Sequence, residues 1–340
     1  MYPLTYFFRH PDAIYFSIEG LFDGIAVAVK KAAPGVFDIE KKLMPCKSSL
    51  RNIFKNITFT KRNQSLVNHI TGDIHYTILG CSRKNINILT IHDCVVLHKY
   101  PRADPRFWVI KWLWYDLPVR KADAVTVISE HTAGEVAHFT KCRREKIRLI
   151  PNFVDPAFIA SPVAARNERP VVLFIGTTPN KNLERLIEAL TGLEIVLEIV
   201  GGLSPAQEAL LEKNNIRYVR CSGISKAELV QKYRDCDLLA FPSTYEGFGL
   251  PILEAQATGR PVLTSGLSPM KEVAGDGACV VDPFDIDAIR KGLLAVLNDE
   301  GYRRKLIAAG YENVRRYKLE KIAEEYAALY QLMIDKRSAK

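Results

Sequence analysis

The residues best suited to chemistry surround a loop between an apolar run ending at Phe241 and a carboxylate at Glu254. The run predicts a buried strand, and Pro251 suits the first turn of a helix, because its missing N–H would have no intrahelical partner there. Backbone N–H groups of a glycine-containing loop at a helix N-terminus bind phosphate well. Glu246 and Glu254, with seven residues between them, flank this loop, and carboxylates accept hydrogen bonds from hydroxyl groups. The stretch therefore predicts a site for a phosphorylated sugar.

Lys181 is the cation best suited to the phosphate of such a ligand. It lies in the loop 176–182, which follows an apolar run at 171–175 that predicts another strand. Loops after parallel strands lie at one edge of a sheet, so this loop and the loop after Phe241 are expected at the same sheet edge of one domain. A surface lysine without a special role is the commoner case, and the neighbouring loop is what favours a phosphate-binding role.

His92 and Asp93 form a second candidate site in the first half of the chain. They follow an apolar run at 87–91, which predicts a buried strand, and so they would lie at its carboxyl end. Ligands of open parallel sheets bind at that end. Considered alone, however, the pair is better explained by Asp93 capping a turn and His92 packing in the interior.

Two other carboxylate pairs favour structural roles. Asp235 and Asp237 could suggest a metal–diphosphate site, but they lead directly into a strand, and Asp285 and Asp287 lie at the start of a helix. We therefore expect caps here and no metal site. The chain also has no Gly-x-x-x-x-Gly-Lys-Ser/Thr, Gly-x-Gly-x-x-Gly or Gly-x-Ser-x-Gly motif. A P-loop nucleotidase, a dinucleotide dehydrogenase and a serine hydrolase are therefore not indicated.

Predicted strands and helices alternate along both halves of the chain, which predicts two doubly wound parallel-sheet α/β domains. In the first half we expect strands at 13–18, 87–91 and 124–128, helices at 21–29 and after a capping Ser129, and a strand or helix end at 65–70. In the second half we expect strands at 171–175, 194–200, 216–219, 238–241 and 260–264, and helices at 183–190, 225–233, 282–297 and 301–336 and from 204 and 251 onward. The loose, proline-containing stretch 153–169 predicts a linker between domains 1–152 and 170–316.

The segment 104–121 contains all three tryptophans, Trp108, Trp112 and Trp114, between basic residues. An aromatic helix with basic flanks can lie in a membrane interface. Such a stripe is more often part of a core, and we favour the core here.

Composition and charge limit the classes of protein that remain. The chain has 340 residues and a net charge of +9, and residues 1–150 hold 23 Lys and Arg against 13 Asp and Glu. This basic half suggests an anionic partner such as a membrane surface, a phosphorylated lipid or nucleic acid, or simply a solvated basic face. Seven scattered cysteines without a Cys-x-x-Cys pair favour a reducing compartment. We expect neither a signal peptide nor a membrane-spanning helix, so any membrane contact would be peripheral.

The stretch Glu246–Glu254 resembles the E-x7-E motif of the retaining glycosyltransferases of family GT4. The resemblance continues through loop 176–183, through residues 255–283, and, in the first half, through residues 90–93, 127–129 and 149–155. It implies the GT-B fold, in which two Rossmann-like domains face each other across a cleft. It also implies that the final segment, 317–340, is a helix that crosses back to the first domain.

The family's binding roles can be carried over to matching positions. The resemblance implies that Glu254 binds the ribose of a nucleotide sugar, that Glu246 binds the transferred sugar, and that Lys181 holds the diphosphate. His92 would bind the donor sugar near the reaction centre. Other donor-binding positions implied are Gly176, Thr177, Ser222, Gly223, Ile224, Phe248, Gly249 and Leu250, and those implied on the acceptor side are Glu19, Gly20 and Asp93.

Two departures from the family pattern concern the phosphate and acceptor sites. Many members have an Arg directly after the strand-terminal glycine of the second domain, where this chain has Thr177. Lys181 is then expected to hold the diphosphate alone, or with Arg185 or another base. The glycine-rich loop near the N-terminus is reduced to Glu19-Gly20 with Gly24.

The resemblance implies a retaining, metal-independent hexosyltransferase that needs no cofactor besides its nucleotide-sugar donor. The expected acceptor is a saccharide or a lipid-linked saccharide of cell-surface polysaccharide such as lipopolysaccharide, with mannose as the transferred sugar by analogy. We expect a cytoplasmic protein, with peripheral contact to the inner membrane face through the basic first domain and no nucleic-acid partner. The alternatives are a GT-B-type phosphorylase or epimerase and a nucleotide-sugar-binding protein without activity.

Overall fold

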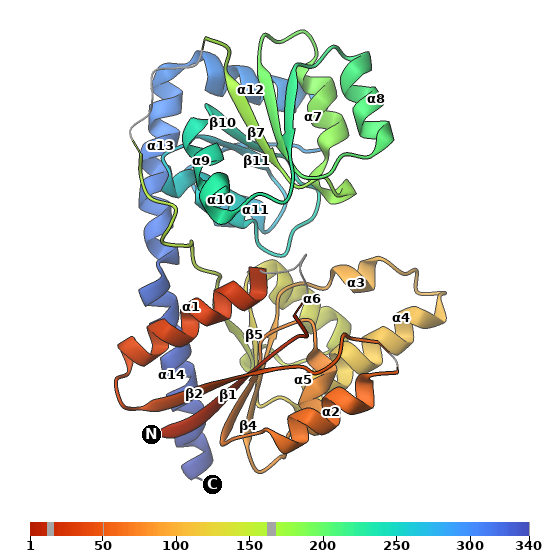
Figure 1. Ribbon diagram of the computed structural model, residues 1–340, viewed down its shortest axis with the longest axis vertical. Coiled ribbons are helices and arrows are strands. Elements are labelled where there is room, and N and C mark those ends of the chain that lie inside the picture. The colour runs from red at the N-terminus through yellow and green to blue at the C-terminus, as the bar shows by residue number, and fades with distance from the viewer. Residues whose placement is uncertain (12–16, 50, 162–167, 340) are drawn as a thin grey trace. The chain divides into compact units, whose positions relative to one another are not determined.

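The computed structural model describes residues 1–11, 17–49, 51–161 and 168–339, and the chain packs into two compact units (Figure 1). The first unit consists of Met1–Phe153 with Leu319–Lys340, and the second of Val154–Lys318. Among the described residues, each unit has one sheet of six parallel strands. The predicted fold class, two doubly wound parallel sheets of α/β type, is therefore confirmed.

The sheet of the first unit has the strand order β2-β1-β3-β4-β5-β6. Its strands are β1 (Tyr2–Phe8), β2 (Phe37–Leu43), β3 (Val67–Ile70), β4 (Ile86–Ile91), β5 (Ala124–Val127) and β6 (Ile147–Leu149). Its helices include α1 (Ser17–Ala32), α2 (Ile53–Arg62), η1 (His75–Gly80), α3 (Val95–His98), α6 (Glu130–Thr140), η3 (Arg144–Lys146) and α14 (Leu319–Ser338). The stretch 65–70, for which two readings were open, contains a strand.

The predicted strand at 13–18 is wrong where the structure describes it. Helix α1 begins at Ser17, and residues 13–16 lie outside the described part of the chain. The first strand is instead β1, whose residues Leu4 to Phe8 are all buried. This strand was not predicted, although five consecutive buried residues are typical of a parallel strand covered on both faces.

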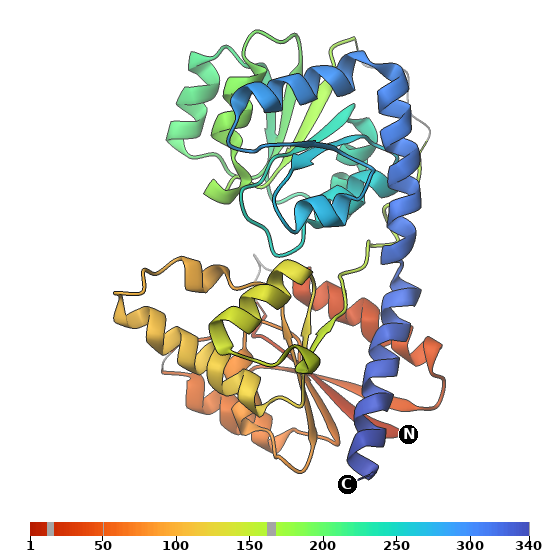
Figure 2. The same ribbon diagram turned by 180° about the vertical axis from the view of Figure 1, so that it is seen from behind.

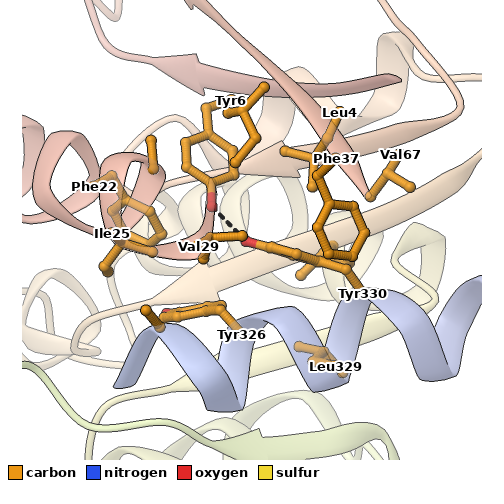
Figure 3. Packing of buried hydrophobic residues seen from close by; sticks show 14 of the residues in the cluster. Leu4, Tyr6, Phe22, Ile25, Val29, Phe37, Val67, Tyr326, Leu329 and Tyr330 are labelled. Carbon is orange, nitrogen blue, oxygen red and sulfur yellow. Dashed lines mark hydrogen bonds between the residues drawn. The ribbon is translucent and has the colours of Figure 1, made fainter. Parts of the chain in front are cut away.

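Helices cover both faces of the first sheet. On one face, α1 and α14 pack on β1 to β4 around Tyr6, Phe22 and Tyr330 (Figure 3). The hydroxyl groups of Tyr6 and Tyr330 are 2.8 Å apart, and the Tyr330 hydroxyl is 2.8 Å from Nδ1 of His69. On the other face, α2, η1 and α6 pack around a second cluster that includes Tyr76 and Val125. The last helix of the chain therefore completes the core of the unit in which the chain begins.

The tryptophan segment is only partly a core element, which corrects our preference for the core. It forms α4 (Pro105–Ile110), a π-helical stretch η2 (Lys111–Asp116) and α5 (Leu117–Lys121). Phe107 and Tyr115 are buried, but Trp108 and Trp112 are 55% and 56% exposed. Helical spacing explains this difference, because residues 108 and 112 lie on one face and residue 107 on another.

The sheet of the second unit has the strand order β12-β11-β10-β7-β8-β9. Its strands are β7 (Val171–Ile175), β8 (Val196–Val200), β9 (Tyr218–Cys221), β10 (Leu238–Phe241), β11 (Val262–Ser265) and β12 (Cys279–Val281). Its helices are η4 (Pro179–Lys181), α7 (Leu183–Leu190), α8 (Pro205–Lys213), α9 (Lys226–Asp235), α10 (Leu250–Ala257), α11 (Met270–Ala274), α12 (Ile286–Asn298), α13 (Glu300–Val314) and η5 (Arg315–Tyr317). The predicted helices from 183 onward are present, except that the one predicted at 301–336 is divided into α13, η5 and α14, with an extended Lys318 before α14. The strand β12 and the helix α11 were missed.

The two faces of the second sheet carry different helices. Helices α7, α8 and α12 pack on one face around Leu186, Leu211 and Leu293, and Figure 2 shows α12 lying across this face. Helices α9, α10 and α11 cover the other face (Figure 1). The chain therefore changes faces between α8 and α9 and changes back at α12, so that the helices after the neighbouring strands β7 and β10 lie on opposite faces.

Candidate functional site

The strand order of the second unit places a switch point between β7 and β10. These two strands are neighbours in the sheet, but their following helices, α7 and α10, lie on opposite faces. At such a point the loops after the two strands diverge and leave a crevice at the carboxyl edge, where α/β proteins bind their ligands. The two loops are those predicted from the sequence to lie at the same sheet edge.

Gly176 leaves room for the side chain of Lys181, the lysine of the first loop. Its φ of +82° lies in the left-handed region, and a Cβ added there would be 3.0 Å from Cε of Lys181. The aliphatic part of Lys181 therefore crosses directly over the glycine, where a side chain would block it. Residues 179–181 form the short helix η4, and Asn182, also left-handed at φ +68°, separates it from α7.

Lys181 and Glu246 meet across the switch point. The lysine Nζ is 2.6 Å from Oε1 of Glu246 and lies 4.7 Å from the centre of the Phe241 ring. Both side chains of this ion pair are largely buried, at 18% and 13% exposure, so water screens their attraction less than it would at the surface. The geometry therefore brings together two of the residues singled out from the sequence.

Backbone hydrogen bonds hold the two loops in register. The Thr244 N–H donates to the Asn180 carbonyl at 2.8 Å, and the Asn180 side chain donates to the Tyr245 carbonyl at 2.9 Å. The buried Asn182 side chain donates to the carbonyls of Pro242 and Pro283, at 3.0 and 2.7 Å. These asparagines were not singled out from the sequence, although an asparagine between a strand and a helix is typical of such turns.

The second loop ends at the N-terminus of α10. Gly249 occupies the capping position with φ +106°, which favours glycine, and Pro251 lies in the first turn, as predicted. Phe248 is 5% exposed and packs edge-on against Tyr317, with ring centres 5.8 Å apart. The buried Phe248 anchors the loop directly before α10, and the free backbone N–H groups and positive dipole end of a helix N-terminus favour an anion.

Glu254, in the second turn of α10, has an unusual environment for a carboxylate. Its Oε2 accepts a hydrogen bond of 2.6 Å from the hydroxyl of Tyr233, whose ring packs edge-on against Phe158. Burial raises the pKa of Glu254 to about 7, against the lowering effect of the Tyr233 hydrogen bond, with a smaller raising effect from Asp155. Glu254 therefore changes charge near neutral pH, which the sequence did not indicate.

The structure shows what surrounds Thr177, where many relatives have arginine. The Thr177 hydroxyl donates to the Gly202 carbonyl, and its own carbonyl accepts from the Gln207 side chain at 3.1 Å, so it ties the β7 loop to the β8 loop. Arg185, the alternative base, donates to the Asn182 side chain at 2.9 Å and lies over the Phe284 ring. Of the two candidate cations, Lys181 is the one that contacts a predicted sugar-binding carboxylate.

The stretch Ser222, Gly223 and Ile224 follows β9, at the edge of the sheet. Ser222 and Gly223 are exposed, and Gly223 has a φ of +66°. Ser225 then starts α9 with a capping box, in which its hydroxyl accepts from the Glu228 N–H and the Glu228 carboxylate accepts from the Ser225 N–H. Two strands, β7 and β8, separate this stretch from the loop after β10, so it flanks the switch point at some distance.

The aspartates suspected as caps have structural partners. Asp237 accepts from the Val171 N–H at 2.8 Å and lies 3.7 Å from Arg303, and Asp285 caps α12 by accepting from the Ala288 N–H at 3.1 Å. Over residues 1–11, 17–49, 51–161 and 168–339, no group of three or more His, Cys, Asp and Glu side chains is arranged to hold a metal ion.

The first unit has its own group of polar residues at the carboxyl edge of its sheet. His92 is 8% exposed, and its Nε2 is 2.8 Å from the Thr71 carbonyl, while Asp93 accepts from the Val95 N–H at 3.0 Å. Asp93 therefore caps a turn, as one of the two interpretations of the sequence predicted. Both residues also line a hollow of about 420 Å³, together with Asp73, His75, Val95, Val96, Ile110, Trp114 and Tyr115.

Glu19 is held by Arg9, which was not predicted as a site residue. Arg9 donates to both carboxylate oxygens of Glu19, at 2.6 and 3.0 Å, and to Asp73 at 2.7 Å. These contacts draw the start of α1 toward the ends of β1 and β3, the two strands at the switch point of this sheet. Gly20 is exposed in the first turn of α1. Arg9 and Asp73 follow buried strands, which is the signal that could have revealed them.

Two family models match the chain, and they meet at residue 158. Residues 158–313 match the model described as Glycosyl transferases group 1, and residues 27–158 match the model described as Glycosyltransferase Family 4. The first match contains the loops after β7 and β10, and the second contains His92 and Asp93. Arg9, Glu19 and Gly20 precede the matched segments.

Curated relatives match over part of their length. The chain is 33% identical over 175 residues to an O-antigen chain mannosyltransferase B of Escherichia coli, which covers 47% of this chain and 45% of the relative. It is 31% identical over 196 residues to a phosphatidyl-myo-inositol mannosyltransferase of Mycobacterium leprae, covering 54% and 52%. The chain therefore spans about half the length of these relatives.

Solved structures of the same fold match almost the whole chain. A sucrose-phosphate synthase from Thermosynechococcus elongatus superposes with a TM-score of 0.77 at 18% identity, covering 99% of this chain and 100% of that one. Anabaena HepE in complex with UDP and glucose superposes with a TM-score of 0.76 at 15% identity, covering 97% and 100%. At these identities the likeness supports the fold alone.

Proposed function

The chain belongs to the family 4 glycosyltransferases, because the two matching models together span residues 27–313, and we propose that it transfers a hexosyl group from a nucleotide-diphosphate sugar. The observation that carries this proposal is the ion pair of Lys181 and Glu246 across the switch point of the second sheet, beside the N-terminus of α10. A cation, a carboxylate and a helix N-terminus in one crevice suit a ligand with both phosphates and hydroxyls.

The donor's parts are assigned to residues of the second unit. Glu254 accepts from the ribose hydroxyls and Glu246 from those of the sugar, while Lys181 and the backbone of Phe248, Gly249 and Leu250 bind the diphosphate between them. Gly176 and Thr177 line the start of the crevice, and Ser222, Gly223 and Ile224 lie along the base. The contacts of Glu246 with Lys181 and of Glu254 with Tyr233 support this division, since each carboxylate is held by a donor that a ligand can share or replace.

The chemistry follows from the charge that develops on the leaving group. As the glycosidic bond breaks, negative charge grows on the nucleoside diphosphate, and the Lys181 ammonium and the α10 dipole stabilise it without needing to reorganise. The acceptor hydroxyl attacks the same face of an oxocarbenium-like sugar, so the configuration is retained. The leaving phosphate takes the acceptor's proton, and neither a metal ion nor a further cofactor is needed. His92 is assigned to the donor sugar by the family resemblance.

The acceptor is proposed to be a saccharide or a lipid-linked saccharide of cell-surface polysaccharide, with Glu19, Gly20 and Asp93 on its side. Mannose is the proposed sugar, because curated relatives in E. coli and M. leprae are mannosyltransferases by name. Asp73 and Trp114 join Asp93 in the hollow of the first unit, and a carboxylate beside an aromatic ring suits a sugar.

Peripheral membrane contact on the cytoplasmic side is proposed for the outer face of α4 and η2. Trp108, Val109 and Trp112 are exposed there between basic residues, and none of the helices in the described ranges has the length and apolar character to cross a bilayer. A Trp108→Ala/Trp112→Ala variant should sediment less with phosphatidylcholine vesicles than the wild type. Phe284→Ala, which removes an exposed aromatic ring from the second unit, is the control that should leave sedimentation unchanged.

The activity is tested first by donor binding and then by transfer. A thermal-shift panel of GDP-, UDP- and dTDP-sugars should give one base that raises the melting temperature, because a ligand that binds only the folded state stabilises it. Incubation of that donor with a mannose-containing saccharide should then give an α-linked product if mannose is transferred with retention. Release of sugar phosphate on addition of inorganic phosphate would favour a phosphorylase, and conversion of the donor sugar without acceptor would favour an epimerase. Binding without any turnover would favour a binding protein.

A further inference from the structure

The amino-terminal edge of the first sheet, where β4, β5 and β6 begin, carries two adjoining hollows of about 770 and 470 Å³. They share Asp123, Glu145 and Lys146 in their linings. Within the described residues, nine Lys and Arg side chains and two carboxylates line them, an excess of seven positive charges where the whole chain has nine. We call this feature the basic trough, and its central cations are Arg83, Lys121, Arg143, Lys146, Arg148 and Arg337.

Separate chain segments converge on the basic trough. Arg83 precedes β4, Lys121 ends α5 just before β5, and Arg143 and Lys146 precede β6. Arg337 comes from the last helix and donates to the Asn85 carbonyl at 3.0 Å, which fixes that helix beside the start of β4. A solvated basic face needs no such convergence, whereas a concave site does.

The nine cations of the trough far outnumber the two carboxylates that line it. Over residues 1–11, 17–49, 51–161 and 168–339, none of the nine forms an ion pair with a carboxylate within 4.0 Å. One of the two carboxylates, Asp123, already accepts from the Asn87 N–H at 2.8 Å. Lys146 reaches only a backbone carbonyl, that of Arg120 at 3.3 Å.

Two of the lysines are half-buried although they form no close ion pair with a described carboxylate. Burial lowers the pKa of Lys121 and of Lys146, and the charge of Arg83 lowers both further, against a raising effect of Asp123. Holding like charges together in a hollow is unfavourable unless an anion relieves the repulsion. The unfavourable arrangement is thus itself an argument for a ligand.

We propose that the basic trough binds a phosphate-bearing anion, at the edge of the sheet opposite to His92. Several arginines together with lysines suit phosphate, since the guanidinium donates two parallel hydrogen bonds to its oxygens and the ammonium adds a compact charge. An excess of seven charges also exceeds what one carboxylate would neutralise. The phosphate is that of an acidic lipid headgroup or of a soluble phosphorylated compound, and the experiment separates these sources.

The test measures inorganic pyrophosphate binding by titration calorimetry in a Lys181→Ala background, so that the loop of the second unit does not contribute. A Lys121→Gln/Lys146→Gln variant should weaken binding at least about tenfold, because each charge-assisted hydrogen bond to phosphate is worth more than a neutral one. Lys213→Gln/Lys305→Gln removes the same charge from exposed positions of the second unit and should leave binding unchanged. Arg83→Gln provides a second trough variant should the double variant unfold.

Vesicles identify the source of the phosphate. If the trough binds a headgroup, the extra sedimentation gained by adding phosphatidylglycerol to phosphatidylcholine vesicles should be lost in the Lys121/Lys146 variant. If pyrophosphate binding depends on these lysines while that gain does not, the ligand is soluble. Equal pyrophosphate binding and equal sedimentation in the trough variants and the Lys213/Lys305 control would overturn the proposal. The proposed transferase activity is not involved in any of these readouts.

Discussion

Lys181 and Glu246 neutralise each other across the switch point of the second sheet, so the proposed donor diphosphate would have to draw the lysine away from a carboxylate 2.6 Å distant. This ion pair affects both of its side chains. The ion pair holds the lysine over Gly176 in a position to meet the diphosphate, and the carboxylate becomes available for sugar hydroxyls when the lysine turns to phosphate. Breaking the pair from either side should therefore affect the chemistry more than the fold.

Lys181→Ala should lower the transfer rate at least about a hundredfold, the usual effect of removing a preorganised group that stabilises developing charge. The measurement is initial velocity with a saturating donor, alongside the melting temperature. Lys232→Ala is the matched control, since Lys232 forms an ion pair with Glu198 in the same unit, also at 2.6 Å. Near-normal transfer by Lys181→Ala would show that Lys181 does not stabilise the leaving group.

The pKa of Glu254 predicts a pH-dependent donor affinity. Because the folded-state pKa is raised to about 7, the carboxyl is mostly protonated at lower pH and ionised above it, and only the ionised form is a strong acceptor for ribose hydroxyls. Affinity for the nucleotide sugar, measured without acceptor, should rise from about pH 6 to about pH 8. Glu254→Gln should bind about tenfold more weakly at the upper pH and lose the dependence.

The same pKa makes a prediction for stability with a definite sign. A carboxyl whose pKa is raised from 4.5 to about 7 contributes stability that is lost as pH rises through that range, because the folded state must ionise a buried group. Glu254→Gln has no carboxyl to ionise here, so its free energy of unfolding should lack the fall with pH that Glu254 causes in this range. Tyr233→Phe should shift the midpoint of this decline to higher pH, since the Tyr233 hydrogen bond lowers the pKa of Glu254. A decline that Glu254→Gln leaves in place would show that another group causes it.

At the scale of elements, the loop after β7 depends on a glycine for two separate reasons. Gly176 adopts φ +82°, and its missing Cβ leaves room for the Lys181 side chain, whereas Gly192 at the end of α7 adopts a similar φ of +73° with open space around it. Comparing substitutions at the two glycines therefore separates the effect of backbone strain from the effect of removing the room for Lys181.

Gly176→Ala and Gly192→Ala should each lower the free energy of unfolding by about 1–2 kcal/mol, because alanine is strained in the left-handed region. Only Gly176→Ala should also weaken nucleotide-sugar binding, since its Cβ would displace Lys181. Chemical denaturation and the thermal shift with bound donor measure the two effects. Equal donor binding in both variants would mean that the course of Lys181 over Gly176 does not matter for binding.

The sequence predicts some of these elements better than others, for physical reasons. The strands of the second unit are short apolar runs bounded by turn residues, and the loops with Lys181 and Glu246 follow two of them, so the elements and the shared sheet edge of the two loops were predictable. That β7 and β10 are direct neighbours is decided by the strand order. The first unit was less predictable, because β2 buries only Phe37 and Ile39 among charged residues, and two of the three buried residues of α2, Asn56 and Thr60, are polar. Arg9 and Asp73 depend on the neighbourhood of β1 and β3, which strand order decides and local pattern does not.

At the scale of the whole molecule, the chain ends in the unit where it begins. Helix α14 lies against α1 and buries Ile322, Tyr326, Leu329 and Tyr330 in the core of the first sheet (Figure 3). Tyr330 also joins a buried polar chain, since His69 connects it to the Thr90 hydroxyl, 2.7 Å from Nε2. The family resemblance, and not any local pattern, was the only signal in the sequence for this return. The stability of the first unit should therefore depend on the last twenty residues of the chain.

Two leucines three residues apart on α14 test this dependence. Leu329 is 5% exposed in the first unit's core and Leu332 is 40% exposed, so the same substitution has different consequences on one helix. Leu329→Ala should lower the free energy of unfolding of the first unit by about 2–5 kcal/mol, the cost of a cavity in a packed core. Leu332→Ala should cost less than about 1 kcal/mol. Hydrogen exchange followed by mass spectrometry separates the units, since amides of β1 and β3 should exchange faster in Leu329→Ala while those of β7 and β10 keep their rates. Equal exchange of β1 and β3 in the two variants would mean that α14 is only an appendage of the first unit and that its core is complete without it.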